Sequence, residues 1–284
     1  MIRFGPSGNS ESFYLEGNKT SIEAPKWLKS KGLNAYEYSF GRGFTSGYET
    51  AKKLGSEAVA NDVLVSVHAP YYINFANIED TAKEKNINYV INSLKFLQFF
   101  NGKKCVFHPG SCGKMTRTEA FNNVLKSMDS LLEEYYKNNF EGLFICPETM
   151  GKTQQIGSVD EIIKMCELDK CLIPTFDFGH INAVTNGGLK TKDDYKRILD
   201  KTFNRLGDFK AKNFHVHFSK IEYSAKGEVK HLTLDDTIYG PQFEPLAELL
   251  DELNLTPTII CESKSQMCED AMKLKSIYEN IRRK

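Results

Sequence analysis

The stretch Cys171-Leu-Ile-Pro-Thr-Phe-Asp-Phe-Gly-His180 decides how the rest of the chain is interpreted. It begins as a short apolar run, which is typical of a buried strand. Asp177 is predicted at the last position of that strand, and His180 follows in the loop, three residues later. A carboxylate and an imidazole at such a place indicate metal ligands or an acid/base pair. The alternative is an Asp that caps the next helix and a His bonded to a backbone group.

The same order, an apolar run followed by a ligand-type residue, recurs along the chain. Eight runs are predicted as strands: Ile2–Gly5, Leu33–Tyr38, Val63–Val67, Lys104–Phe107, Leu143–Cys146, the stretch ending at Asp177, Asn213–Phe218 and Thr258–Cys261. Eight helical stretches alternate with them: Ser21–Lys31, Ser46–Ala60, Thr81–Phe100, Thr116–Asn138, Ser158–Leu168, Thr191–Leu206, Phe243–Leu253 and Gln266–Ile281. The polar segment Lys226–Tyr239 is too long for an ordinary connection, so we expect it to be functional or mobile.

This alternation predicts the fold class. Strands separated by helices pair in parallel, and eight such units close an α/β (β/α)8 barrel, the TIM barrel, here a single domain over residues 1–284. A doubly wound open sheet is the alternative, but it would place ligands only near a switch point and not at nearly every strand end.

Composition excludes several classes of protein. The 284 residues contain 37 Lys and Arg and 37 Asp and Glu, so the formal net charge is zero, which argues against a strongly basic nucleic-acid scaffold but permits a local basic rim. The seven cysteines form no Cys-x-x-Cys pair. No signal-peptide core and no run of transmembrane length is present, so we expect a reduced, cytoplasmic location and no membrane partner.

All six histidines are expected at, or just after, the C-terminal end of a predicted strand, and three carboxylates share that position. The set comprises His68, His108, His180, His215, His217, His231, Glu148, Asp177 and Glu262. In a closed barrel these ends converge on one mouth. Mixed imidazole and carboxylate ligands suit zinc, and also manganese or iron, so a polynuclear metal site is predicted. Cys105, Cys146 and Cys261 are interpreted as buried apolar residues and not as ligands.

Several of these motifs resemble those of endonuclease IV, the metal-dependent apurinic/apyrimidinic endonuclease. The similar stretches are Val67–Asn74 (VHAPYYIN), Phe107–Gly110 (FHPG), Pro147–Thr149 (PET), Asp177–His180 (DFGH), His215–Lys220 (HVHFSK) and Cys261–Ser263 (CES). They follow the family's order over about residues 63–264, and the specificity lies in the set as a whole.

The resemblance implies a (β/α)8 barrel with three zinc ions. Its first ion would be held by His68, His108 and Glu148, and Glu148 would bridge to a second ion that Asp177, His215 and Glu262 complete. The resemblance matches His215, and not His217, to the ligand, so His217 is expected to orient neighbours by hydrogen bonding. A third ion would bind His180 and His231. The family's additional Asp is replaced here by Val229, with Glu228 as the neighbouring substitute, so we expect weaker binding of this ion.

The implied activity is cleavage of the phosphodiester 5′ to an abasic site in duplex DNA, which leaves a 3′-hydroxyl, with Glu148 as the catalytic carboxylate. Abasic or 3′-blocked duplex DNA is the implied partner of a monomer. Tyr71 matches the tyrosine that probes the lesion, and Arg42 and Lys220 are further candidates for DNA contact. Two alternatives stay open: a sugar isomerase or epimerase of related barrel type, which uses a carboxylate for proton transfer, and a non-catalytic binder of damaged DNA.

Overall fold

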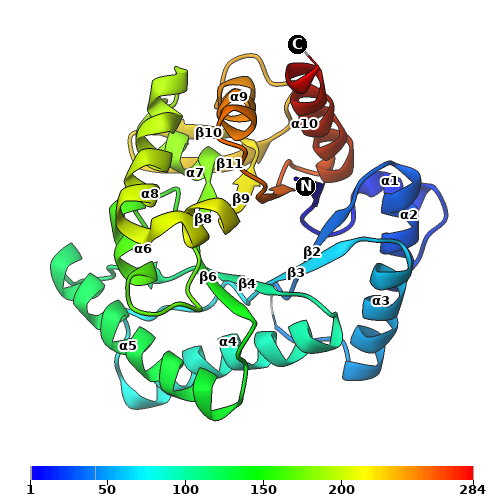
Figure 1. The fold of residues 1–284 in the computed structure, drawn as a ribbon. Helices are drawn as coiled ribbons and strands as arrows, with labels where there is room; N and C mark the ends of the chain where they lie inside the picture. The colour runs from blue at the N-terminus through cyan, green and yellow to red at the C-terminus, as the bar shows by residue number, and fades with distance from the viewer. Residues whose placement is uncertain (1, 42, 284) are drawn as a thin grey trace.

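A closed ring of parallel strands forms the centre of the computed structural model, which describes residues 2–41 and 43–283 (Figure 1). Its strands are β1 (Arg3–Pro6), β2 (Ala35–Ser39), β3 (Leu64–His68), β4 (Lys104–Phe107), β6 (Phe144–Pro147), β8 (Thr175–Asp177), β9 (His215–Phe218) and β12 (Thr258–Cys261). Two four-stranded sheets, β2-β3-β4-β6 and β1-β12-β9-β8, make up the ring. Parallel bridges between Ser7 and Glu37, and between Glu148 and Thr175, join the sheets at both seams. The predicted (β/α)8 barrel is confirmed.

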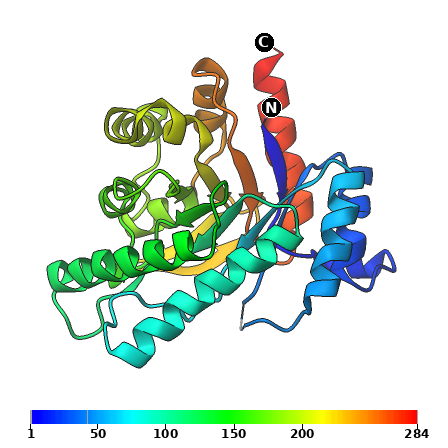
Figure 2. The ribbon, with the colours of Figure 1, turned by 60° about the horizontal axis from the view of Figure 1, so that its bottom comes forward.

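Helices surround this ring and cover its outer face (Figures 1 and 2). They are α1 (Glu11–Leu15), the 3-10 turn η1 (Ser21–Glu23), α2 (Ala24–Ser30), α3 (Tyr48–Ala60), α4 (Asp80–Phe99), α5 (Arg117–Lys137), α6 (Val159–Cys166), α7 (Phe178–Val184), α8 (Lys192–Asn213), α9 (Glu244–Glu252) and α10 (Met267–Arg282). In Figure 2, α4 and α5 lie side by side along one flank. None of the helices within the described ranges is both long and apolar enough to cross a bilayer.

The helices bury an apolar stripe against the strands. On α4, Val90, Ile91, Leu94 and Leu97 are buried at helical spacing. Each fully buried aliphatic side chain contributes roughly 1.5–3 kcal/mol to the free energy of unfolding. A capping box starts α6, with the Ser158 hydroxyl accepting from the backbone N–H of Glu161. The core thus lies between helices and strands and leaves the strand ends free to carry polar groups.

Several helices differ from the predicted ones. Helix α7 begins directly after β8, because Asp177 caps it by accepting a hydrogen bond from the His180 backbone N–H (2.8 Å). His180 therefore lies in the first turn of a helix and not in a loop. Helix α8 continues past the predicted end at Leu206, with a break at Gly207, whose φ is 73°. The short helix α1 was not predicted.

An antiparallel ribbon follows β9, and its second strand includes the first half of the polar segment Lys226–Tyr239. It consists of β10 (Lys220–Ser224) and β11 (Gly227–Leu232), which pair only with each other among the strands of the described ranges. Two very short strands, β5 (Gly110–Ser111) and β7 (Gln155–Ile156), form a second small antiparallel pair. The ribbon contacts α7, so it lies over the same end of the barrel as His180.

Candidate metal centre

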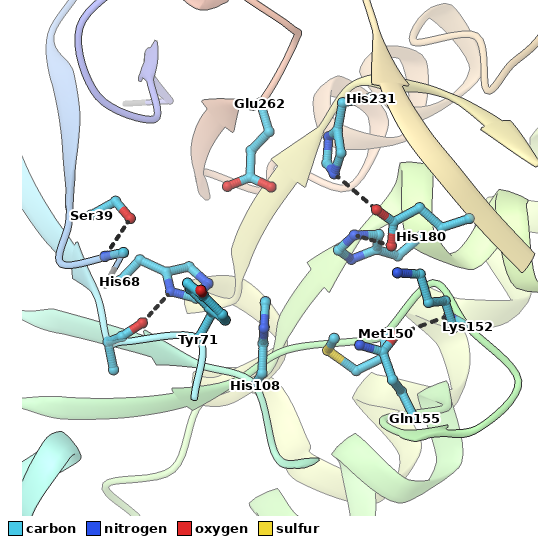
Figure 3. A pocket seen from close by; sticks show the side chains of 13 residues that line it. Ser39, His68, Tyr71, His108, Met150, Lys152, Gln155, His180, His231 and Glu262 are labelled. Atoms are coloured by element: carbon cyan, nitrogen blue, oxygen red, sulfur yellow. Dashed lines mark hydrogen bonds and ion pairs between the residues drawn. The ribbon is translucent and has the colours of Figure 1, made fainter. Parts of the chain in front are cut away.

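The barrel mouth collects the ligand-type side chains around one polar hollow of about 360 Å³ (Figure 3). Side chains alternate along a strand, so residues two apart point to the same face. In β3, Ser66 and His68 both point into the barrel. In β6 the inward-facing series that contains Cys146 continues to Glu148, the first residue after the strand. His68, His108, His180, His231 and Glu262 line the hollow directly.

One group of ligand atoms, which we call the barrel group, consists of His68, His108 and Glu148. The Nε2 atoms of the two histidines lie 3.1 and 3.2 Å from the same Glu148 oxygen, Oε2. Nδ1 of His68 lies 2.8 Å from the carbonyl oxygen of Ala69, which accepts a hydrogen bond when that nitrogen carries the proton. The ring then presents the lone pair of Nε2 to the hollow, as a metal ligand must.

A second group, the central group, consists of Glu148, Asp177, His217 and Glu262. The other oxygen of Glu148, Oε1, lies 2.9 Å from Nδ1 of His217, and the nearest Glu262 oxygen lies 3.5 Å from that nitrogen. Glu148 therefore belongs to both groups, with one oxygen facing each.

The third group, the ribbon group, consists of His180, Glu228 and His231. The Nε2 atoms of the histidines lie 3.6 and 3.7 Å from the two oxygens of Glu228. Nδ1 of His180 lies 3.0 Å from the Thr149 carbonyl oxygen and Nδ1 of His231 lies 2.9 Å from the Ser219 hydroxyl, so both rings direct Nε2 into the group.

A β-bulge explains how Glu228 and His231, three residues apart, share one side of the ribbon. Glu222 pairs with Lys230 while Tyr223 pairs with Glu228, so Val229 is the extra residue of β11. The bulge breaks the two-residue alternation at Val229, which is 52% exposed. The structure thus brings the substitute Glu228 into the group.

The expectation for His215 is wrong in position. His215 is the first residue of β9 and pairs with Thr258, whereas His217 pairs with Ile260, one layer nearer the mouth. Because both residues point into the barrel, the difference of two residues moves the imidazole by about 6.6 Å along the strand. His217 consequently joins Glu148, Asp177 and Glu262, and His215 lies in the layer beneath.

Glu37 is a site residue that sequence reasoning missed. It lies in β2, is fully buried, and its oxygens are 2.9 Å from Nε2 of His215 and 2.8 Å from Nε2 of His217. A glutamate within the apolar run Leu33–Tyr38 was the available signal, because a charge inside a predicted strand needs a buried partner.

The buried charges of the mouth depend on one another. Burial raises the pKa of Glu148, but the neighbouring histidines, His217 first, lower it well below its ordinary value. Burial lowers the pKa of His68, yet the hydrogen bond and charge of Glu148 bring it to about 9. Burial raises the pKa of Asp177, and the charges of Glu148 and Glu262 act in the same direction. The site is therefore an array of crowded carboxylates compensated by imidazoles.

This array fits divalent cations. The Oδ2 atom of Asp177 is buried and has no hydrogen-bond partner among the described residues, although Nδ1 of His180 lies 3.3 Å from it. Leaving such an oxygen unpaired costs a few kcal/mol, which a bound cation would recover. Imidazole nitrogens and carboxylate oxygens are the donors that zinc, manganese and iron accept. Within the described ranges, neither these three groups nor the group of Glu37, His215 and His217 beneath them includes a cysteine.

The rim of the hollow carries an exposed aromatic residue, Tyr71, and a lysine, Lys152. Tyr71 is 51% exposed, lines the hollow, and packs against Tyr72 with ring centroids 4.2 Å apart. The expectation for Lys220 is wrong, because that side chain is buried and its ammonium donates to the Asp236 carbonyl. Arg42 lies outside the described residues.

Comparison with known proteins shows where the chain belongs. Residues 25–281 match the family described as xylose isomerase-like TIM barrels. An uncharacterized protein of Methanocaldococcus jannaschii is 34% identical, with 99% of this chain and 98% of that one covered. A probable endonuclease 4 of Mycoplasma genitalium is 26% identical, with 82% of each chain covered.

Solved structures show the same fold at low identity. A D-tagatose 3-epimerase-like protein superposes with a TM-score of 0.73 and 19% identity, covering 99% of this chain and 98% of that one. Endonuclease IV from Thermus thermophilus superposes with a TM-score of 0.67 and 16% identity, covering 98% and 99%. Enzymes of both kinds therefore share this barrel, and the resemblance to endonuclease IV is confirmed at the level of the family. With a family match over nearly its whole length, the chain belongs to the xylose isomerase-like TIM barrels.

Proposed function

We propose that this protein is a metal-dependent endonuclease that hydrolyses the phosphodiester 5′ to an abasic site in duplex DNA and leaves a 3′-hydroxyl. The observation that supports it most is that three ligand groups surround one open hollow and that two of them share Glu148. Phosphodiester cleavage benefits from several cations, since charge develops on both the attacking and the leaving oxygen. The relative named probable endonuclease 4 points in the same direction.

The ligand roles follow the three groups. The barrel, central and ribbon groups would each hold one cation, with zinc as the proposed ion and manganese or iron as the alternatives. Such cations lower the pKa of water and neutralise charge on a phosphate. Glu148 would be the residue whose two oxygens link the barrel group to the central group.

The rest of the mouth would receive the DNA. Tyr71 and the neighbouring Tyr72, whose rings are tilted by 38° against each other, would offer ring faces to a base or to the gap left by a missing base, because aromatic faces stack on bases regardless of sequence. Lys152 and Gln155 line the hollow across from Tyr71 and would donate hydrogen bonds to phosphate oxygens (Figure 3).

The test uses a labelled duplex with one abasic analogue that cannot undergo elimination. Metal-loaded protein should produce a fragment ending in a 3′-hydroxyl at the lesion, and chelation should abolish it. The same duplex with a normal nucleotide at that position is the control. Retention of the duplex in a gel shift without cleavage, under zinc, manganese and iron, would identify a non-catalytic binder of damaged DNA and overturn the proposal.

A second candidate is a sugar epimerase with one cation. It is favoured by the central group, whose three carboxylates and one imidazole form a complete ligand set by themselves. In that case Glu148 or Glu262 would transfer the proton, and the ribbon group would be dispensable. Turnover of a free ketohexose that survives replacement of both His180 and His231, with no effect on abasic duplex, would select this candidate.

A further inference from the structure

Glu37 lies one layer below the mouth and is enclosed on all sides. It pairs with Ser66 across β2 and β3, whereas Ser39 pairs with His68 at the level of the hollow. The Ser66 hydroxyl donates to Oε2 of Glu37 (2.8 Å), and Nε2 of His215 lies 2.9 Å from the same oxygen. A carboxylate with no exposed surface is costly unless it is paired, so this arrangement needs an explanation.

The two ring nitrogens of His217 explain this arrangement. Its Nδ1 faces Glu148, and its Nε2 lies 2.8 Å from Oε1 of Glu37. An imidazole that offers the lone pair of Nδ1 to a cation keeps its proton on Nε2. Glu37 is the acceptor at the right distance for that proton, although in this structure the two atoms form an ion pair without the alignment of a hydrogen bond.

His217 differs in this respect from the other candidate ligands. Nδ1 of His68 and Nδ1 of His180 face backbone carbonyls, and Nδ1 of His231 faces a hydroxyl. Nδ1 of His180 also lies 3.3 Å from Oδ2 of Asp177, but that carboxylate belongs to the central group. Among these four histidines within the described ranges, His217 alone has an outer carboxylate, Glu37, that belongs to none of the three mouth groups. A carboxylate behind a ligand imidazole fixes its tautomer and orientation and makes the ring a stronger donor.

We propose that Glu37 is a positioning residue of the metal centre, which fixes the tautomer and orientation of His217, and that Ser66 and His215 hold Glu37 in place. The inference rests on metal binding by the central group, as proposed above, and holds for either candidate reaction. It also assigns a role to His215, which supports the carboxylate from the layer beneath, packs edge-on against the His217 ring (centroids 5.3 Å apart) and belongs to none of the three mouth groups.

The test is cobalt binding followed by visible absorption, with wild type, Glu37→Gln and Ser66→Ala. Glu37→Gln keeps the shape of the side chain and removes its charge. We expect its cobalt affinity to fall by about 10–100-fold and the ligand-field bands to shift, because the donor strength and orientation of His217 change. Ser66→Ala leaves the contact between Glu37 and His217 intact. It should therefore change the cobalt affinity and the ligand-field bands far less.

Two further measurements keep the outcomes distinct. The thermal midpoint of the metal-free proteins separates loss of folding from loss of binding, and Glu37→Asp, which keeps the charge on a shorter side chain, should recover part of the affinity. Equal affinity and equal spectra for wild type and Glu37→Gln would overturn the inference. So would a Glu37→Gln protein that binds one ion fewer with an unchanged spectrum for the rest, since Glu37 would then itself be a ligand. If wild type binds no cobalt, it is the proposed metal centre that fails.

Discussion

The barrel group and the ribbon group hold the same kinds of donor but are built in different ways. In the barrel group, two histidines on strand ends converge on Glu148, whose side chain has no exposed surface, at 3.1 and 3.2 Å. In the ribbon group, the histidines lie 3.6 and 3.7 Å from Glu228, whose side chain is 16% exposed. The second group has the longer contacts, and its shared carboxylate is the more exposed of the two.

The difference follows from what sets each position. The barrel group is set by the register of β3, β4 and β6, which cannot shift without moving the core. The ribbon group depends on a two-stranded ribbon that docks on the segment after β6, where the Glu228 backbone N–H donates to the Gly151 carbonyl (2.8 Å). We therefore expect the ribbon group to bind its ion independently of the barrel group. The ribbon ion should be bound more weakly and should be lost first.

The largest effect is expected for Glu148→Gln. This change removes the charge that the barrel and central groups share, so both should lose their ions while the ribbon group keeps its own. Activity should fall by on the order of 10²–10³-fold or more, as when a preorganised electrostatic group is removed. Elemental analysis and the nicking assay measure the two effects. Full metal content in Glu148→Gln would show that the shared carboxylate is not a ligand.

A smaller effect is expected for Glu228→Gln, which should release one ion only. Binding in the ribbon group should weaken, with the rate reduced by roughly 10–100-fold. The matched control is Glu222→Gln on the same ribbon, which loses an ion pair with Lys230 (2.9 Å) but no contact with the site. If Glu228→Gln empties all three groups, the two regions are not independent.

The segment that supports the ribbon provides a test by pH. Glu161 accepts two hydrogen bonds from Arg117 and one each from the backbone N–H groups of Gly157 and Ser158. Burial raises the pKa of Glu161, but these donors hold it below its ordinary value of 4.5. A lowered folded-state pKa means that this stabilisation is present above pH 4.5 and is lost as the pH falls through the folded-state value.

Glu161→Gln should therefore lower the free energy of unfolding by about 1–3 kcal/mol at neutral pH, and by less at acidic pH. Denaturant unfolding at several pH values measures this difference. The ribbon ion should be weakened before the ions of the other groups. If the difference in the free energy of unfolding between wild type and Glu161→Gln stays constant below pH 4.5, the stabilising role of the ionised Glu161 is contradicted.

The smallest effect is expected at the bulge. Val229→Asp places a carboxylate where the resemblance to endonuclease IV expects one, yet Val229 is exposed on the far side of the bulge. In the Val229→Asp protein, the free energy of unfolding should change by no more than about 0.5 kcal/mol, and the metal content should stay the same. The double variant Glu228→Val/Val229→Asp should bind the ribbon ion no better than Glu228→Gln. Recovery of that ion would show that the bulge is not maintained in solution.

By itself, the sequence determined the architecture and the residue types of the site. Apolar runs that end in His, Asp or Glu predict strands whose C-terminal ends meet, and parallel pairing then leaves a closed barrel as the compact arrangement. The predicted and observed ranges of β4 and β12 coincide, because each is a short apolar run with a clear stop. Helix boundaries such as that of α6 follow from capping residues that act over three positions.

Only the tertiary structure decided which donors meet. His215 and His217 are equivalent by alternation, and the register against β8 and β12 selects His217. Glu228 reaches its group through a bulge, and the fold turns Lys220 inward to a carbonyl instead of outward to solvent. Glu37 acquires its role from strand β9, about 180 residues away along the chain. Local pattern encodes which face of a strand a side chain occupies, but the depth of that side chain in the barrel depends on its neighbours in space.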